Sequence, residues 1–442
     1  MPIIAGIMLP HPPLAISEVG GGEEEKIKST LDGFEEAAEK IAELRPDTII
    51  LTSPHAVMYH DYFHISPGRG ARGDMGSFRA PQVSFSVDYD EDLVQKICRR
   101  ADKLGIPAGT SGERDRKLDH GTMVPLYFVN KYYTDYQLVR IGLSGFSLEV
   151  HYNFGRLIKS VADETDKRIV FLASGDLSHC QKEDGPYGYK KEGPEYDKRL
   201  MEIMGKGDFS KLLTFDENFL EKAEECGHRS FVIMAGAFDG LKVEPRIMSH
   251  EATFGVGYGT GIFMPKEEEM KKESTDPLVK LAVETINSYV KDRKRPDKSS
   301  YPEEALKVRA GAFVSVHECG MLRGCIGTIG PTMDNLAQEI VQNAISAVSK
   351  DPRFEPVTED ELSSLEINVD VLKEPEPISS MKELDVKKYG VIVESGYKRG
   401  LLLPDLEGVD SVEEQVLIAR RKGGIGDSEK YSLYRFEVER HV

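Results

Sequence analysis

Histidines follow three apolar runs of the sequence, at the points where buried strands are expected to end. His11 follows "GIMLP", His55 follows "IILTSP", and His179 follows "FLASGDLS". Proline or glycine closes each run; proline does so because it lacks the N–H that a sheet ladder needs and fixes its own φ. In open α/β sheets, ligands bind at the carboxyl ends of the strands. The sequence therefore predicts that these imidazoles converge in one crevice.

A fourth histidine, His120 in "KLDHGTMVPLYF", also stands beside a glycine at an element end. Neutral imidazoles bind Fe, Zn, Cu or Ni, and two imidazoles with one carboxylate form a facial triad that leaves coordination positions open. Histidines that do not bind the metal are suited to carry protons, because their pKa lies near neutral pH. The alternative for His120 is a turn residue that hydrogen-bonds within its own loop.

Strand and helix signals alternate over the first part of the chain. Apolar residues recur at steps of three and four from Ile27 to Leu44, which is the pattern of an amphipathic helix. Apolar runs at 47–55, 136–144 and 167–179 have strand character, and 154–165 is typical of a helix. This alternation predicts an α/β fold, in which a mostly parallel sheet has helices on both faces.

A charged segment, "MPKEEEMKKESTDP", separates this part from the rest of the chain. It predicts an exposed linker at 266–275, between a domain at 1–265 and a second domain at 276–442. The second domain begins with an amphipathic helix, for which Asp276 is in the capping position and Pro277 is near the start. A helix at 334–349, strands such as "LEINVDVL" and a hairpin around Ser395–Gly396 follow. Helices segregated from hairpins predict a smaller α+β domain.

The composition is that of an acidic globular protein. The chain has 442 residues, with Lys+Arg 57 against Asp+Glu 75 and a formal net charge of −18. Such a surface repels phosphate backbones, so nucleic acid is not expected as a partner. The five cysteines form no CxxC pair, and no apolar stretch is long enough to span a bilayer. Without a signal-peptide pattern at the start, we expect a cytoplasmic protein with no membrane partner.

Four motifs together resemble a known family. "HPP", "SPHA", "DHGTMVPL" and "SGDLSH" occur in the order found in class III extradiol ring-cleavage dioxygenases of the LigB type and in the related Memo proteins. The resemblance covers residues 1–265 and implies that His11 and His55 are metal ligands. It implies that His179 is the acid/base residue beside the substrate and that His120 hydrogen-bonds the substrate. By the same likeness, Asp176 orients His179 or a nearby water.

The resemblance leaves the third metal ligand open. The family places it at the start of a late helix, which here reads "AEECGHRSFVIMAGAFDG". Dioxygenases of this type use a carboxylate there, which indicates Glu225, whereas Memo proteins have a cysteine before glycine, which indicates Cys226. The count back from Gly236 favours Cys226, but a carboxylate keeps an iron site hard and oxygen-competent. His228 and Glu251 are further candidates, and Glu251 better fits a structural corner of the pocket.

The second domain resembles the AMMECR-type family through "LRGCIG", "DPRF" and "RGLLLP". Proteins that join these two domains are associated with a radical-SAM partner, so the resemblance implies such a partner here. Near Gly324 and Gly327, backbone N–H groups can approach an anion while Arg323 supplies charge. The residues favour the alternative, in which the glycines permit a tight bend and Cys325 packs.

Two functions follow from these likenesses. The first is a metal-dependent oxidoreductase of the extradiol dioxygenase type, in which Fe(II) binds a small aromatic or diol-like substrate. The second is a Memo-like metal-binding protein or scaffold, which acts with a radical-SAM partner and has no ring-cleavage activity. A thiolate ligand would favour zinc or copper and the second function.

Overall fold

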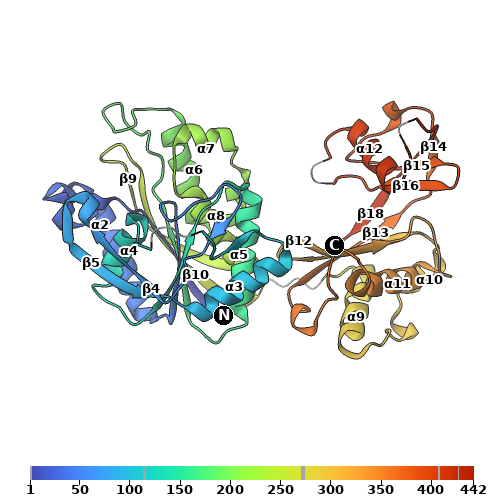
Figure 1. Cartoon of the computed structure of the whole chain (residues 1–442), viewed down its shortest axis with the longest axis horizontal. Helices are drawn as coiled ribbons and strands as arrows, with labels where there is room; N and C mark the ends of the chain where they lie inside the picture. The colour runs from blue at the N-terminus through green and yellow to red at the C-terminus, as the bar shows by residue number, and fades with distance from the viewer. Residues whose placement is uncertain (1, 113–115, 270–273, 407–408, 427) are drawn as a thin grey trace. The chain divides into compact units, whose positions relative to one another are not determined.

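The chain folds into two compact units, residues 1–271 and 272–442 (Figure 1). The structure is a computed structural model, and it describes residues 2–112, 116–269, 274–406, 409–426 and 428–442. Within these ranges, no helix is long and apolar enough to cross a membrane.

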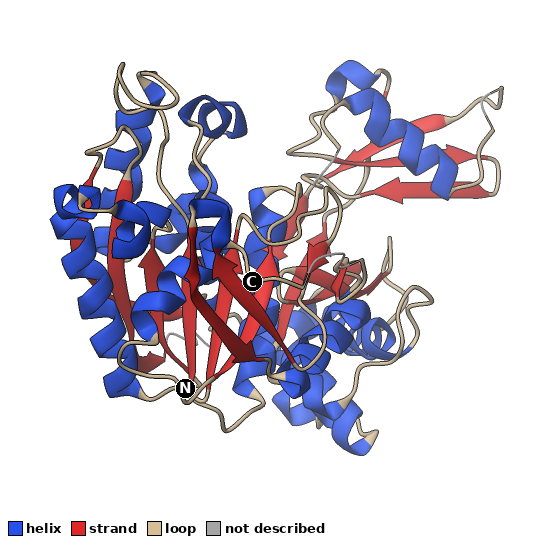
Figure 2. Cartoon of the chain, turned by 60° about the vertical axis from the view of Figure 1, so that its left-hand side comes forward, coloured by secondary structure: helices blue, strands red, loops and turns tan. Residues whose placement is uncertain are grey.

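A six-stranded sheet forms the centre of the first unit (Figure 2). Its strands, in order across the sheet, are β7 (Gln137–Gly142), β2 (Thr48–Ser53), β8 (Ile169–Ser174), β1 (Ile3–Leu9), β10 (Tyr258–Glu269) and β9 (Leu241–Glu251). The first four strands are parallel, and β10 pairs antiparallel with both β1 and β9. Every residue of β2 and β8 is buried, as expected of strands covered on both faces. The predicted α/β fold with a mostly parallel sheet is confirmed.

Helices cover both faces of this sheet. On one face, α2 (Lys28–Leu44) and α4 (His120–Val129) share a core with β1, β2 and β8. On the other face, α5 (Leu148–Asp163) and α8 (His228–Ala237) pack against each other and against β1, and α3 (Glu91–Leu104) packs on α5. A Cβ atom at Gly6 of β1 would lie 2.9 Å from the Phe238 ring, so glycine permits the close approach after α8.

Shorter elements complete the first unit. They are α1 (Ser17–Gly20), β3 (Phe63–His64), β4 (Gly70–Met75), β5 (Ala80–Asp88), β6 (Ala108–Gly109), α6 (Glu192–Lys206) and α7 (Glu217–Ala223). β4 and β5 form an antiparallel pair, β3 pairs with β6, and α6 packs against α7 and β9.

The carboxyl ends of three parallel strands lie at one edge of the sheet. β1 ends at Leu9, which is paired with Ser174, the last residue of β8. β2 ends at Ser53, next to β8 on its other side. The segments that follow these strands therefore start side by side, as the sequence predicts for an α/β sheet.

Two four-stranded antiparallel sheets form the second unit. One consists of β12 (Met321–Gly327), β11 (Ala312–Glu318), β13 (Leu365–Leu372) and β18 (Val438–His441); the other consists of β14 (Glu376–Ile378), β17 (Ser432–Phe436), β15 (Gly390–Ser395) and β16 (Lys398–Leu402). α9 (Pro277–Asp292) and α11 (Leu336–Ser349) share a core with the first sheet, α10 (Glu303–Lys307) contacts α11, and α12 (Val412–Lys422) packs on the second sheet. The predicted α+β domain, with its hairpin at Ser395–Gly396, is confirmed.

The last strand of the first unit extends into the segment predicted as a linker. β10 runs to Glu269, which pairs with Leu241, so residues 266–269 belong to the sheet of the first unit. A charged pattern is typical of edge strands as well as of linkers, so it does not separate the two. Residues 270–273 of the predicted linker lie outside the described residues. α9 begins at Pro277, where the side chain of Asp276 accepts hydrogen bonds from the N–H groups of Leu278 and Val279.

The guanidinium of Arg323 is hydrogen-bonded within the second unit. Its Nε and Nη2 atoms donate to the Glu361 carboxylate at 2.7 and 3.3 Å, and Nη1 donates to the Glu355 carbonyl at 2.8 Å. Both charged side chains are buried. The thiol of Cys325 lies 3.3 Å from the Ser315 hydroxyl, and burial raises the pKa of this thiol. These contacts favour the packing alternative over an anion site at "LRGCIG".

Candidate metal centre

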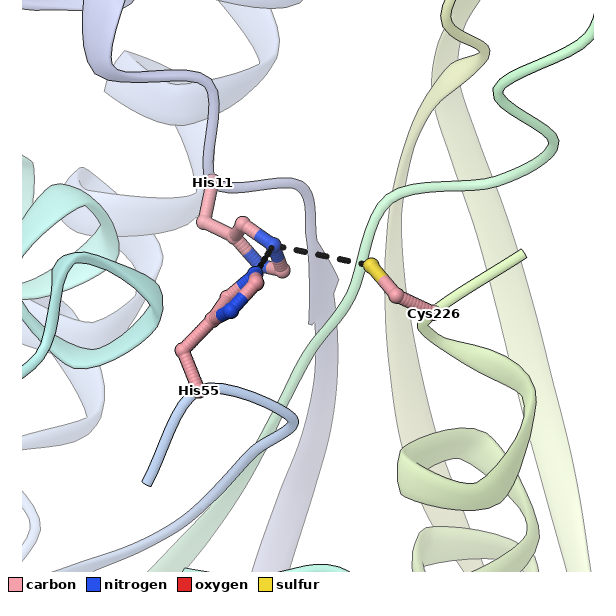
Figure 3. A group of neighbouring side chains, drawn as sticks. All are labelled: His11, His55 and Cys226. Atoms are coloured by element: carbon pink, nitrogen blue, oxygen red, sulfur yellow. Dashed lines mark hydrogen bonds between the residues drawn. The ribbon is translucent and has the colours of Figure 1, made fainter. Parts of the chain in front are cut away.

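The imidazoles of His11 and His55 and the thiol of Cys226 converge at the carboxyl edge of the sheet (Figure 3). His11 Nε2 lies 3.0 Å from His55 Nε2 and 3.6 Å from Cys226 Sγ, and the three donor atoms lie within 4.8 Å of one another. A tetrahedral ion with ordinary bond lengths holds two nitrogens about 3.3 Å apart and a nitrogen and a sulfur about 3.6 Å apart. The spacing of these donors fits one metal ion.

A hydrogen-bond chain fixes which nitrogen of His11 faces the other donors. The hydroxyl of Ser174 donates to the Gly121 carbonyl at 2.6 Å, so its oxygen is left to accept from His11 Nδ1 at 3.0 Å. With the proton on Nδ1, the lone pair of Nε2 is directed at His55 and Cys226. Metal-binding histidines commonly have such a partner on the second nitrogen.

Cys226 and Glu225 are neighbours in sequence but have different roles in space. The carboxylate of Glu225 accepts the N–H of His228 at 2.6 Å, at the start of α8, and burial raises the pKa of Glu225 to about 7. The Sγ atom of Cys226 accepts the N–H of Asp176 at 3.3 Å and faces His11. Among the described residues, the clusters of metal-binding donors include Cys226 and do not include Glu225. The geometry therefore supports a thiolate as the third donor.

The other two candidates for the third ligand have structural contacts. His228 is fully buried, and its ring nitrogens lie 3.0 Å from the Leu212 carbonyl and 3.3 Å from the Tyr196 hydroxyl. Glu251 accepts from the Ser29 hydroxyl and from the N–H and hydroxyl of Thr30, which ties β9 to α2. Neither side chain reaches the donor cluster, in agreement with the structural interpretation of Glu251.

His120 and His179 flank the three donors. The ring of His120 lies 4.0 Å from that of His55 and 5.5 Å from that of His11, between centroids. A donor atom of His179 lies within 4.8 Å of donors from Asp176 and Cys226. The Asp176 carboxylate accepts the backbone N–H of His11 at 2.8 Å, and its role in orienting His179 or a nearby water stays a prediction. Of the seven residues predicted for the site, all except Glu225 thus lie close together.

The electrostatics of the site keep its imidazoles neutral. Burial lowers the pKa of His11 well below its ordinary value, and the nearby imidazoles of His55, His120 and His179 lower it further. Burial also lowers the pKa of His120 to about 4 and raises that of Asp176 to about 7. Neutral imidazoles present the lone pairs that metal ions need. The neutral imidazoles therefore fit a bound metal, whereas burial raises the pKa of the Cys226 thiol, which must lose its proton when a metal binds.

Sequence reasoning missed the residues that support the ligands. Ser53, Asp119 and Ser174 each connect to a histidine of the site through one or two hydrogen bonds. Asp119 could have been found, because aspartate directly before an apolar helical stretch is a capping signal. No pattern in the sequence indicates the two serines. Aromatic rings also line the site: Phe78 lies 5.3 Å from His120, and Tyr187 lies 5.0 Å from His179.

Comparison with known protein families assigns a family to each of the two domains. The family described as the catalytic LigB subunit of aromatic ring-opening dioxygenase matches residues 5–261. The chain belongs to the LigB family. The AMMECR1 family matches residues 279–441, so the chain joins a LigB domain to an AMMECR1 domain, as the motifs predict.

Similar proteins occur in bacteria and archaea. The chain is 42% identical to a protein from Clostridium acetobutylicum, and the match covers 98% of each chain. It is 55% identical to a protein from Thermotoga maritima over 37% of this chain and 97% of that protein. Among solved structures, an uncharacterised protein from Pyrococcus horikoshii matches 37% of this chain and 88% of its own, at 31% identity and a TM-score of 0.34.

Proposed function

We propose that the LigB domain binds one transition-metal ion through His11, His55 and Cys226 and acts as a metal-dependent oxidoreductase of the Memo-like kind. The observation that carries the proposal is the spacing of the three donor atoms, with Cys226 rather than Glu225 as the third. Two imidazoles and a thiolate favour zinc or copper over a hard cation. A bound ion of this type would supply Lewis acidity and, for copper or iron, one-electron chemistry.

The residues around the donors define what the site does with a ligand. His55 is exposed, whereas His11 is buried, so the cluster is accessible from the His55 side. His120 and His179 are neutral imidazoles beside that opening, and each can accept or return a proton at a ring nitrogen. The rings of Phe78 and Tyr187 lie beside His120 and His179, respectively. The site thus combines metal donors and proton carriers with two neighbouring aromatic rings.

Extradiol ring cleavage with Fe(II) is the second candidate function. The family match favours it, because the family is described as a ring-opening dioxygenase subunit. A carboxylate also lies near the cluster, since Asp176 Oδ2 is 3.9 Å from His11 Nε2. Reconstitution with Fe(II) and a catechol probe under O₂ tests this candidate. Yellow ring-opened product that depends on His179 would support it, and no product would leave the Memo-like function.

Metal analysis of the full chain tests the main proposal. Protein purified without oxygen should carry about one transition-metal ion per chain, and His11→Ala or His55→Ala should remove most of it, because two donors hold an open site weakly. His60→Ala is the matched control, because His60 is exposed and lies outside the cluster. Unchanged metal content in both ligand variants would contradict the proposal.

A further inference from the structure

We infer that the first turn of α4, residues Asp119 to Thr122, positions the metal donors, and that Asp119 is the positioning residue for His55. The inference rests on the proposed metal site and gives Asp119, the first residue of the "DHGTMVPL" motif, a role that neither the motif nor the family match assigns. Asp119 precedes His120 and caps α4, where its carboxylate accepts the N–H of Thr122 at 3.0 Å.

The link from Asp119 to His55 runs through Ser53. The hydroxyl of Ser53, at the end of β2, donates to Asp119 Oδ1 at 2.6 Å. Its oxygen then accepts the backbone N–H of His55 at 3.2 Å. The turn that carries His55 is therefore bound to a carboxylate 66 positions away in the sequence.

Gly121 places the same turn against both histidine ligands. A Cβ atom there would lie 2.4 Å from Ser53 Oγ, 3.0 Å from Asp119 Oδ1 and 3.3 Å from His55 Cδ2, so only glycine leaves room for this contact. The Gly121 carbonyl accepts the Ser174 hydroxyl, which in turn fixes the tautomer of His11. One helical turn thus carries His120 itself and contacts the supports of the other two imidazoles.

A buried cation accompanies the Asp119 carboxylate. Arg140 is almost fully buried, and its Nη1 lies 3.9 Å from Asp119 Oδ2. Arg140 also donates to Ser66 Oγ at 2.7 Å and to the Lys117 carbonyl at 2.8 Å, which holds the guanidinium in place. The second carboxylate oxygen of Asp119 accepts the Thr122 hydroxyl at 2.8 Å. Both oxygens are engaged, so Asp119 has one defined orientation.

Zn²⁺ binding to the full chain tests the inference through Asp119→Asn. Asparagine caps helices as well as aspartate does, so the variant should keep α4 and lose the charge. Loss of a partner that orients a metal ligand typically costs about 10- to 100-fold in affinity, and we expect that weakening here. Asp276→Asn, which changes the capping residue of α9, is the matched control and should bind Zn²⁺ as the unmodified chain does.

Two further measurements separate positioning from general stability. The visible absorption of the Co²⁺-substituted protein reports ligand geometry, and it should change in Asp119→Asn and stay unchanged in Asp276→Asn. Ser53→Ala should weaken Zn²⁺ binding in the same direction, and the double variant should be no weaker than Asp119→Asn, because the two residues act in series. If Asp119→Asn lowers the thermal midpoint more than the control does, the Zn²⁺ affinity of Ser53→Ala alone decides whether the inference holds.

The outcomes distinguish this inference from the proposed metal site. If His55→Ala loses Zn²⁺ while Asp119→Asn and Ser53→Ala bind it like the unmodified chain, the metal site stands and the positioning role is wrong. If the double variant weakens binding by the product of the two single effects, the residues act independently and the series through Ser53 is wrong. If His55→Ala retains Zn²⁺, the proposed site itself fails.

Discussion

The proton on Nδ1 of His11 decides what its Nε2 atom can do. Because Ser174 gives its own hydrogen to the Gly121 carbonyl, it can only accept from His11, and the Nε2 lone pair then faces His55 and Cys226. Asp176 holds the backbone of the same residue by accepting the His11 N–H. His11 is thus fixed in position and in tautomer before any metal binds, which reduces the reorganisation that metal binding requires.

At the residue scale, the burial of His151 predicts that the stability of the protein depends on pH. His151 is fully buried, and its Nδ1 atom lies 2.9 Å from the Ser147 carbonyl. Burial lowers its pKa to about 4, below the value near 6.5 of an unfolded chain. The contribution of His151 to stability is therefore complete above pH 6.5 and falls as the pH drops towards 4, by about 2 kcal/mol at pH 5. We expect His151→Gln to remove that share of the pH dependence.

Urea unfolding at pH 7 and pH 5, followed by circular dichroism with a chelator present, measures this effect. Circular dichroism is the suitable probe because the chain has no tryptophan. His60→Gln, at an exposed position, should keep the pH dependence of the unmodified chain. An equal loss of stability in His151→Gln and in the unmodified chain would show that His151 is not the titrating group.

The convergence of the histidines could be predicted from sequence, and the choice between Glu225 and Cys226 as the proposed third donor could not. A proline or glycine after an apolar run ends a strand and leaves the next polar side chain at the sheet edge, which is why His11 and His55 were recognisable. The choice between Glu225 and Cys226 depends on the turn between α7 and α8. In that turn Glu224 has a φ of +50°, a left-handed conformation that no sequence pattern predicts.

At the scale of elements, the metal cluster depends on the close approach of β8 and the start of α8. A Cβ atom at Gly175 would lie 2.1 Å from the Cα atom of Gly227. These glycines let the segment with Asp176 lie directly against the turn with Cys226, where the Asp176 N–H donates to Sγ. The parallel order of the strands was predictable from the alternating pattern, but this contact between glycines 52 positions apart depends on tertiary packing.

Gly175→Ala should separate these two segments. The added methyl group meets backbone and not a flexible side chain, so we expect a loss of stability of about 1–3 kcal/mol together with weaker Zn²⁺ binding. Gly205→Ala in α6 is the control, because its Cβ atom would meet only Ile247 at an ordinary 3.6 Å. Thermal unfolding and Zn²⁺ titration of both variants check the prediction. Equal behaviour of the two variants would mean that the approach of β8 and α8 does not shape the site.

At the scale of the whole molecule, each unit has its own hydrophobic core. Phe34 and Ile49 belong to the core of the first unit, and Val314 and Ile340 belong to that of the second. The fold class of both units was predictable, because it follows from the order of helix and strand patterns. The pairing of Arg323 with Glu361, 38 positions later, was not, since distant charge pairs leave no local pattern.

Cutting the chain within 270–273 should give two fragments that fold separately. We expect fragment 1–271 to bind metal with the affinity of the full chain, because all the proposed donors lie in it. Fragment 272–442 should bind no metal at the same concentration. Circular dichroism, gel filtration and metal analysis of both fragments measure this. Aggregation of fragment 1–271, with the full chain remaining in solution, would show that the units are not independent.

The most direct test of the metal centre compares the metal content of Cys226→Ser and Glu225→Gln after anaerobic purification. The side chains keep nearly the same size, and glutamine can still accept the N–H of His228. A thiolate donor at Cys226 predicts that Cys226→Ser loses most of the metal and that Glu225→Gln retains it, with an affinity that falls as the pH drops because the thiol must lose its proton. Loss of metal from Glu225→Gln alone would contradict the account and identify a site of two histidines and one carboxylate.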